Sequence, residues 1–197
     1  MLAKLVERGR WQEASEELCE RQYDMLCQTL RDAGYRHYEI SNFALPGYEA
    51  RHNSAYWRHI PYVGFGPGAH SYVIGSRTLN APVVSSHKWA TPAYQASETR
   101  TKYNRLWNEP DLNKYIEDPA GCQDGEELTQ EQLVLERIML SLRTAEGIQE
   151  SYLREHCDRH ELSRAFDSGN LVHLPDGNVR IPENRFFLSD KIISDII

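Results

Sequence analysis

The sequence predicts an α/β fold in an N-terminal domain, followed by a small helical C-terminal domain that resembles a winged helix. Residues 15–43 give a helical segment, a glycine stop and an alternating aromatic-rich segment, which is one helix-to-strand step of an α/β domain. A turn-rich stretch over 119–125 interrupts the chain, and helices flanking a β-hairpin are predicted beyond it. We therefore expect one domain over residues 1–118 and a second over 126–197.

The first half of the chain predicts helices and strands that place polar motifs at strand ends. Ser15 is followed by leucines at helical spacing, and Gly34 stands where a left-handed helix cap belongs. Residues 35–43 alternate and are rich in aromatic side chains, so we expect a strand there. Residues 62–65 predict a second, short strand that opens into a glycine-rich loop. Because ligands gather at the carboxyl ends of strands in parallel α/β sheets and barrels, we expect a site beyond both strands.

Signals are weaker over residues 74–113, where we expect at least one helix, and become strong again in the tail. Thr129 and Gln132 stand in the capping-box positions of a helix, and Asp176-Gly177 has the composition of a hairpin turn. We expect helices over 130–144, from Ser151, over 162–169 and over 187–197, with a β-hairpin over 171–181.

Composition and charge exclude several classes of protein. The chain has 197 residues, with 22 Lys and Arg against 29 Asp and Glu, and its net charge is −7. From Glu127 to the C-terminus, 8 basic residues face 13 acidic ones, a balance of −5. Because nucleic-acid partners need a basic face, we expect no nucleic acid. No apolar run reaches the roughly 20 residues of a transmembrane helix, and the four scattered cysteines indicate reduced thiols of a cytoplasmic protein.

Residues 51–57 carry the most informative motif. His52, Asn53, Tyr56 and Trp57 combine a metal-ligating side chain with two aromatic rings, a set suited to a flat cofactor. We expect these residues on a loop, with His52 as the metal ligand. The alternative is a histidine that pins the loop by hydrogen bonds, beside a tryptophan that is simply buried.

The second motif is the glycine-rich segment formed by Gly64, Gly66, Gly68 and Ala69. Glycine has no Cβ, so its backbone allows a ligand to approach closely. The pattern is weak by itself, because it lacks the Lys-Ser/Thr of a phosphate loop and breaks the spacing of a dinucleotide fingerprint. A tight strand-to-loop turn is the alternative.

Two further residues and one pair of residues have two interpretations each. Glu39 either binds a polar ligand group or pairs with Arg51. His70 either ligates or has a structural role, and the structural role is favoured. His156 and His160 have the i, i+4 spacing of metal ligands on a helix, but a solvated helix face is the favoured interpretation because no third ligand lies nearby.

Taken together, residues 38–43, 52–57 and 64–71 closely resemble the HemW family of radical-SAM haem chaperones, long described as oxygen-independent coproporphyrinogen III oxidases. Residues 136–143, followed by Gly147-Ile148, resemble the C-terminal domain of that family. The resemblance implies a partial, incomplete radical-SAM TIM-like barrel, followed by a small winged-helix-like domain. It is weakest over residues 75–125.

The resemblance also implies cofactors and a function. It associates His52, Asn53, Tyr56 and Trp57 with haem, and it places Gly64, Gly66, Gly68 and Ala69 near S-adenosyl-L-methionine (SAM). It implies a [4Fe-4S] cluster on a CxxxCxxC motif that this sequence lacks, so we expect an upstream segment to supply it and the chain alone to be inactive as an enzyme.

The expected function is haem binding and delivery to a recipient protein in the cytoplasm. One alternative is coproporphyrinogen III oxidation in porphyrin synthesis, and the other is a non-catalytic protein-interaction module.

Overall fold

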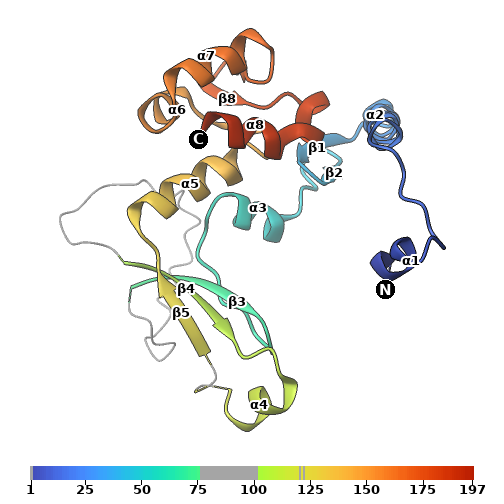
Figure 1. Cartoon of the computed structure of the whole chain (residues 1–197). Coiled ribbons are helices and arrows are strands. Elements are labelled where there is room, and N and C mark those ends of the chain that lie inside the picture. The colour runs from blue at the N-terminus through green and yellow to red at the C-terminus, as the bar shows by residue number, and fades with distance from the viewer. Residues whose placement is uncertain (1, 76–101, 120, 122) are drawn as a thin grey trace. The chain divides into compact units, whose positions relative to one another are not determined.

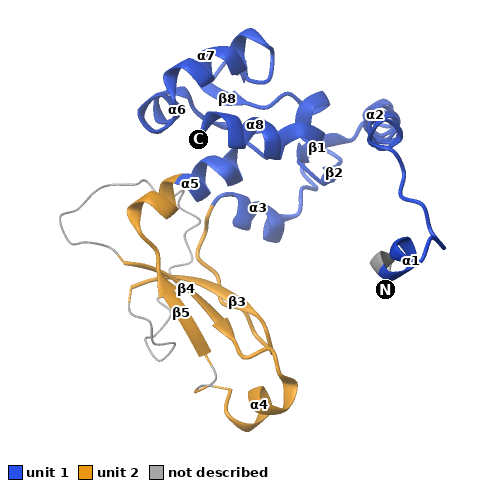
Figure 2. Ribbon diagram, viewed as in Figure 1, with its two compact units in different colours: residues 1–58, 135–197 blue, residues 59–134 orange. Residues whose placement is uncertain are grey.

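The computed structural model describes residues 2–75, 102–119, 121 and 123–197, and the chain forms two compact units. Figure 2 shows unit 1, which combines residues 1–58 with 135–197, and unit 2, which covers residues 59–134. Helix α5 (Gln130–Ser141) crosses from one range into the other.

The N-terminal part of unit 1 contains one long helix and four short elements (Figure 1): α1 (Leu2–Glu7), α2 (Glu16–Asp32), β1 (Arg36–Glu39), β2 (Asn42–Ala44) and α3 (Arg51–Trp57). The predicted start and end of α2 are confirmed, because the Leu18 N–H donates to Ser15 Oγ at 3.2 Å and Gly34 has a φ of 85°. The single strand predicted over 35–43 is wrong. The chain turns at Ile40 and Ser41, so β1 and β2 form a two-stranded antiparallel hairpin.

The tail of unit 1 contains β6 (Ile148–Gln149), α6 (Glu150–His156), α7 (Arg159–Asp167), β7 (Val172–His173), β8 (Asn178–Arg180), a 3-10 helix η1 (Glu183–Leu188) and α8 (Ser189–Ile196). Its three strands are antiparallel in the order β6-β8-β7. The predicted helices, hairpin and final helix are confirmed here. The core is made of buried apolar side chains, among them Ile138, Leu142, Leu153, Val179, Phe186 and Ile196.

The β1–β2 hairpin joins the tail through its backbone. The Ile40 N–H donates to the Arg143 carbonyl at 2.9 Å, and the Ala145 N–H donates to the Tyr38 carbonyl at 3.0 Å. Glu39 and Thr144 form an isolated bridge between these two contacts. Unit 1 is therefore closed by hydrogen bonds between segments about a hundred residues apart in sequence.

Unit 2 contains a three-stranded antiparallel sheet of β3 (His70–Ile74), β4 (Tyr103–Asn108) and β5 (Gln123–Glu127), with helix α4 (Leu112–Glu117). Burial alternates along the central strand β4, where Asn104, Leu106 and Asn108 are buried. Strand β5 begins within the stretch predicted to be turn-rich. Most of the 74–113 segment lies outside the described residues, and the described part gives β4 and the start of α4.

The strand predicted over 62–65 is wrong, because Tyr62 alone bridges to Tyr72. The chain mixes helices and strands, as predicted. Every strand pairing within the described ranges is antiparallel, so the parallel pairing assumed for the site does not occur there. Within those ranges, no helix combines the length and the apolar character that crossing a bilayer requires.

Candidate functional site

The motif of residues 52–57 lies on helix α3 and not on a loop. Helical backbone bonds connect the Ser54 N–H to the Ala50 carbonyl at 2.9 Å and the Arg58 N–H to the Ser54 carbonyl at 3.0 Å. Sequence reasoning missed this helix because it is two turns long and has no apolar stripe. Its C-terminal end is tied to the tail of unit 1, since Arg58 Nε donates to Glu146 at 3.1 Å.

On a helix, the four motif residues fall into two rows of i, i+4 neighbours. His52 and Tyr56 form an exposed row, whereas Asn53 and Trp57 form a half-buried row. The His52 and Tyr56 rings meet edge to face with centroids 4.8 Å apart. The Tyr56 hydroxyl lies 3.2 Å from His52 Nε2. Imidazole is a common axial ligand of haem iron, and an aromatic ring can pack on a flat macrocycle.

The glycine-rich loop lies in unit 2, and its backbone is held by the protein itself. The Gly64 N–H donates to Ser71 Oγ at 2.9 Å, and the Gly66 N–H donates to the Tyr115 hydroxyl at 3.2 Å. The Asn108 amide in turn donates to the Gly66 carbonyl at 2.9 Å. The N–H groups of Gly68 and Ala69 also have protein acceptors, the carbonyls of Glu109 and Gly66. A ligand at this loop therefore meets a surface of glycine Cα atoms and carbonyls, because these amide donors are already used.

Glycine is required at two of these positions for different reasons. Gly66 has a φ of 99°, a conformation that side chains rarely adopt. At Gly64, an added Cβ would overlap the His70 carbonyl oxygen. The tight turn considered as an alternative thus accounts for both residues, and close approach of a ligand stays a prediction.

Glu39 has a structural environment. Only 1% of the residue is exposed, and its carboxylate accepts hydrogen bonds from the Ser41 N–H at 3.2 Å and from the Asn42 amide. It thereby caps the turn of its own hairpin.

The remaining histidines do not gather into a metal site. His70 is exposed and pairs across the sheet with Trp107, with ring centroids 6.2 Å apart. The shared helix face predicted for His156 and His160 is wrong, because His156 ends α6 and His160 lies on α7. Among the residues that the structure describes, no three His, Cys, Asp or Glu side chains converge as metal ligands do.

Two cysteines on α2, Cys19 and Cys27, lie eight positions apart. This separation is about 12 Å along the helix axis, so the two thiolates do not fit one [4Fe-4S] cluster.

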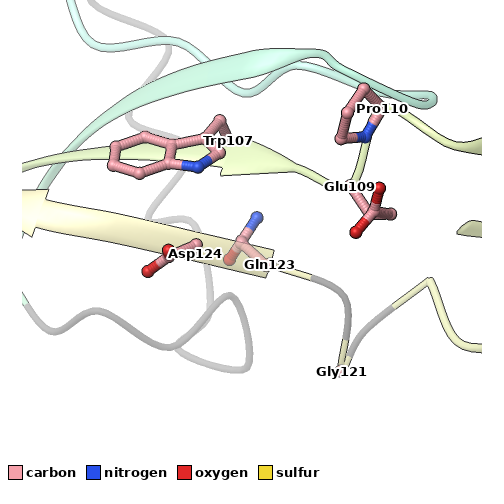
Figure 3. A pocket seen from close by; sticks show the side chains of 6 residues that line it. All are labelled: Trp107, Glu109, Pro110, Gly121, Gln123 and Asp124. Atoms are coloured by element: carbon pink, nitrogen blue, oxygen red, sulfur yellow. The ribbon is translucent and has the colours of Figure 1, made fainter.

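A shallow pocket in unit 2 was not predicted from the sequence (Figure 3). Trp107 on β4 and Asp124 on β5 are register partners, and Glu109 and Pro110 lie just beyond the end of β4. Gly121 and Gln123 complete the lining. The glycine loop adjoins it, because the Gly68 N–H donates to the Glu109 carbonyl at 3.1 Å. An indole beside two carboxylates suits a cationic group. The sequence carries no local signal for this pocket, because strand pairing brings its residues together.

Comparison with known proteins places the chain in a structural class. No protein-family model matches it. In structure it is similar to coproporphyrinogen III oxidase (HemN) from Escherichia coli, which is described as a radical SAM enzyme. The TM-score is 0.56 at 14% sequence identity, over 92% of this chain and 41% of that one. The fold is thus similar to part of a radical SAM protein.

In sequence, the chain is similar to haem chaperones named HemW and to a mitochondrial radical SAM protein. The haem chaperone HemW of Synechocystis sp. is 37% identical over 61% of this chain and 24% of that protein, and HemW of Bacillus subtilis is 28% identical over 79% and 35%. The mitochondrial radical S-adenosyl methionine domain-containing protein 1 of Danio rerio is 26% identical over 93% of this chain and 38% of that protein. The predicted resemblance is confirmed, and the chain spans 24–38% of these relatives.

Proposed function

We propose that this chain is part of a cytoplasmic haem chaperone, which binds haem and delivers it to a recipient protein. The observation that carries the proposal is the exposed His52–Tyr56 row on α3, where an imidazole and an aromatic ring lie side by side on two exposed residues. The similarity to proteins named as haem chaperones supports it.

Each motif residue has a distinct part in this proposal. His52 supplies the axial nitrogen, and Tyr56 offers its ring to the porphyrin. Asn53 and Trp57 belong to the half-buried row, so they hold the helix in unit 1 and shape the edge of the site. Bound haem supplies the iron that the imidazole ligates.

SAM and a [4Fe-4S] cluster belong, in this proposal, to the intact protein. Gly64, Gly66, Gly68 and Ala69 would line the SAM side of the barrel, with carbonyls and Cα atoms as the contact surface. The cluster ligands would come from a CxxxCxxC segment outside this sequence, since the described cysteines lack the required spacing.

We further propose that residues 1–118 belong to the partial barrel and residues 126–197 to a winged-helix-like domain. The order α5-β6-α6-α7-β7-β8 and the sheet order β6-β8-β7 support the second assignment. With 8 basic and 13 acidic residues from Glu127 onward, this tail suits a protein partner better than a phosphate backbone.

The alternative of coproporphyrinogen III oxidation rests on a likeness of fold alone, at 14% identity. A non-catalytic interaction module is the other alternative, and it predicts no haem binding.

Titration of the whole chain with hemin, followed by its Soret band, tests the proposal. His52→Ala should weaken hemin binding at least about tenfold and shift the Soret band, since it removes the iron ligand. His160→Ala is the matched control, because that imidazole is also exposed (79%) and lies on another helix. Equal spectra and affinities for wild type and His52→Ala would refute the assignment of His52. Absence of hemin binding to wild type would favour the interaction module.

A further inference from the structure

The nitrogen of His52 that is best placed to bind a metal is already engaged by a neighbour. Nε2 is the ring nitrogen farther from the backbone, and the Tyr56 hydroxyl lies 3.2 Å from it. The two rings are nearly perpendicular, with an interplanar angle of 87°. Because the residues are one helical turn apart on α3, the helix itself maintains this contact.

The direction of the hydrogen bond follows from the acidity of the two groups. A phenol is a good donor, and the lone pair of a neutral imidazole is the strongest acceptor that either ring offers. The contact therefore fits a Tyr56 hydroxyl that donates to Nε2, with the imidazole proton on Nδ1. In this state, the lone pair that would ligate iron is occupied.

We propose that Tyr56 is a gate on the metal-binding nitrogen of His52, which sets how tightly haem is held. This inference rests on the proposed function, because it takes haem iron as the metal that His52 binds. Iron must displace the Tyr56 hydroxyl from Nε2, so every binding event breaks one hydrogen bond. The same bond re-forms when haem leaves, which favours release and suits a carrier that passes its cargo on.

If Tyr56 is a gate, removal of its hydroxyl should strengthen hemin binding. Tyr56→Phe keeps the aromatic ring and deletes only the competing hydroxyl. One exposed hydrogen bond corresponds to about threefold to tenfold in affinity, so hemin should bind tighter by this factor. Tyr56→Ala also removes the ring contact and should bind more weakly than Tyr56→Phe.

The experiment combines hemin titration with 15N NMR of the imidazole in the hemin-free chain. Wild type should show the Nδ1–H tautomer of His52, and Tyr56→Phe should move toward the Nε2–H tautomer that free imidazoles prefer. Tyr48→Phe is the control, because that tyrosine is 81% exposed and lies outside the motif. It should change neither the tautomer nor the affinity.

The outcomes separate the gate from the proposed function. If hemin binding needs His52 but Tyr56→Phe leaves the affinity unchanged or lowers it, the gate is wrong and haem binding stands. A lower affinity would point instead to Tyr56 as a ligand. If His52→Ala leaves hemin binding unchanged, both proposals fail. The tautomer measurement still reports whether the hydrogen bond between Tyr56 and His52 forms.

Discussion

The imidazole of His37 stacks on the ring of Phe43, with the two centroids 4.0 Å apart and the planes within 13°. His37 is 4% exposed and lies on β1 opposite Phe43 on β2, so the stack is a cross-strand pair of the hairpin. Its Nε2 lies 3.3 Å from the Ile40 carbonyl and 3.5 Å from the Tyr23 hydroxyl, whereas its Nδ1 has no hydrogen-bond partner. A neutral imidazole fits this environment better than a charged one.

Unit 1 should therefore lose stability in mild acid. Burial lowers the pKa of His37 below its ordinary value of 6.5, although the Ile40 carbonyl opposes this shift. Above pH 6.5 the residue is neutral in both states, so its contribution is constant. Below pH 6.5 the unfolded chain binds a proton that the folded chain refuses, and stability falls with a limiting slope of about 1.4 kcal/mol per pH unit.

Urea unfolding at several pH values between 7.5 and 5 measures this effect. His37→Phe keeps the stacked ring and should flatten the decline, whereas the exposed His160→Ala should leave it unchanged. Identical pH profiles for His37→Phe and wild type would show that His37 is not the group responsible.

Two glycines with nearly the same backbone conformation should respond differently to alanine. Gly147 has a φ of 66° and Gly169 a φ of 71°, so Ala strains both by about 1–3 kcal/mol. At Gly169 an added Cβ meets no atom within 4 Å, but at Gly147 it overlaps the Val179 carbonyl oxygen. Val179 is fully buried on β8, so the neighbour has little room to move.

Gly147→Ala should therefore cost clearly more unfolding free energy than Gly169→Ala, by roughly 1–3 kcal/mol for the overpacked contact. Thermal or urea unfolding of the two variants measures the difference directly. Equal losses would mean that β6 and β8 separate easily at this point.

Glu39 should act on stability and not on ligand binding. Its buried carboxylate satisfies the Ser41 N–H and the Asn42 amide, so Glu39→Ala leaves two donors without this acceptor and should cost about 1–3 kcal/mol. Glu39→Gln keeps one acceptor oxygen and should cost less. Unfolding measurements, paired with hemin titration, distinguish a structural role of Glu39 from a role in ligand binding. A loss of hemin affinity at unchanged stability would show that Glu39 takes part in binding.

Elements whose signals are local could be predicted from the sequence. Ser15 caps α2 through a residue three positions away, and Thr129 and Gln132 form their reciprocal capping box at 2.8 Å and 3.2 Å. Asp176-Gly177 turns the predicted hairpin, with Gly177 at a φ of 83°. These contacts form between near neighbours, so residue type and spacing suffice to predict them. The HemW resemblance was likewise readable from contiguous motifs.

The other features follow from the tertiary structure, because strand pairing and burial depend on partners far away in the chain. The alternating 35–43 segment forms a hairpin that bonds to Arg143 and Ala145 through Ile40 and Tyr38. Trp107 lies opposite Asp124 because of the register of β4 and β5. The motif of residues 52–57 is a helix too short and too polar for periodicity to reveal. A helix places residues i and i+4 on the same face. For this reason His52 and Tyr56 form one exposed pair on α3.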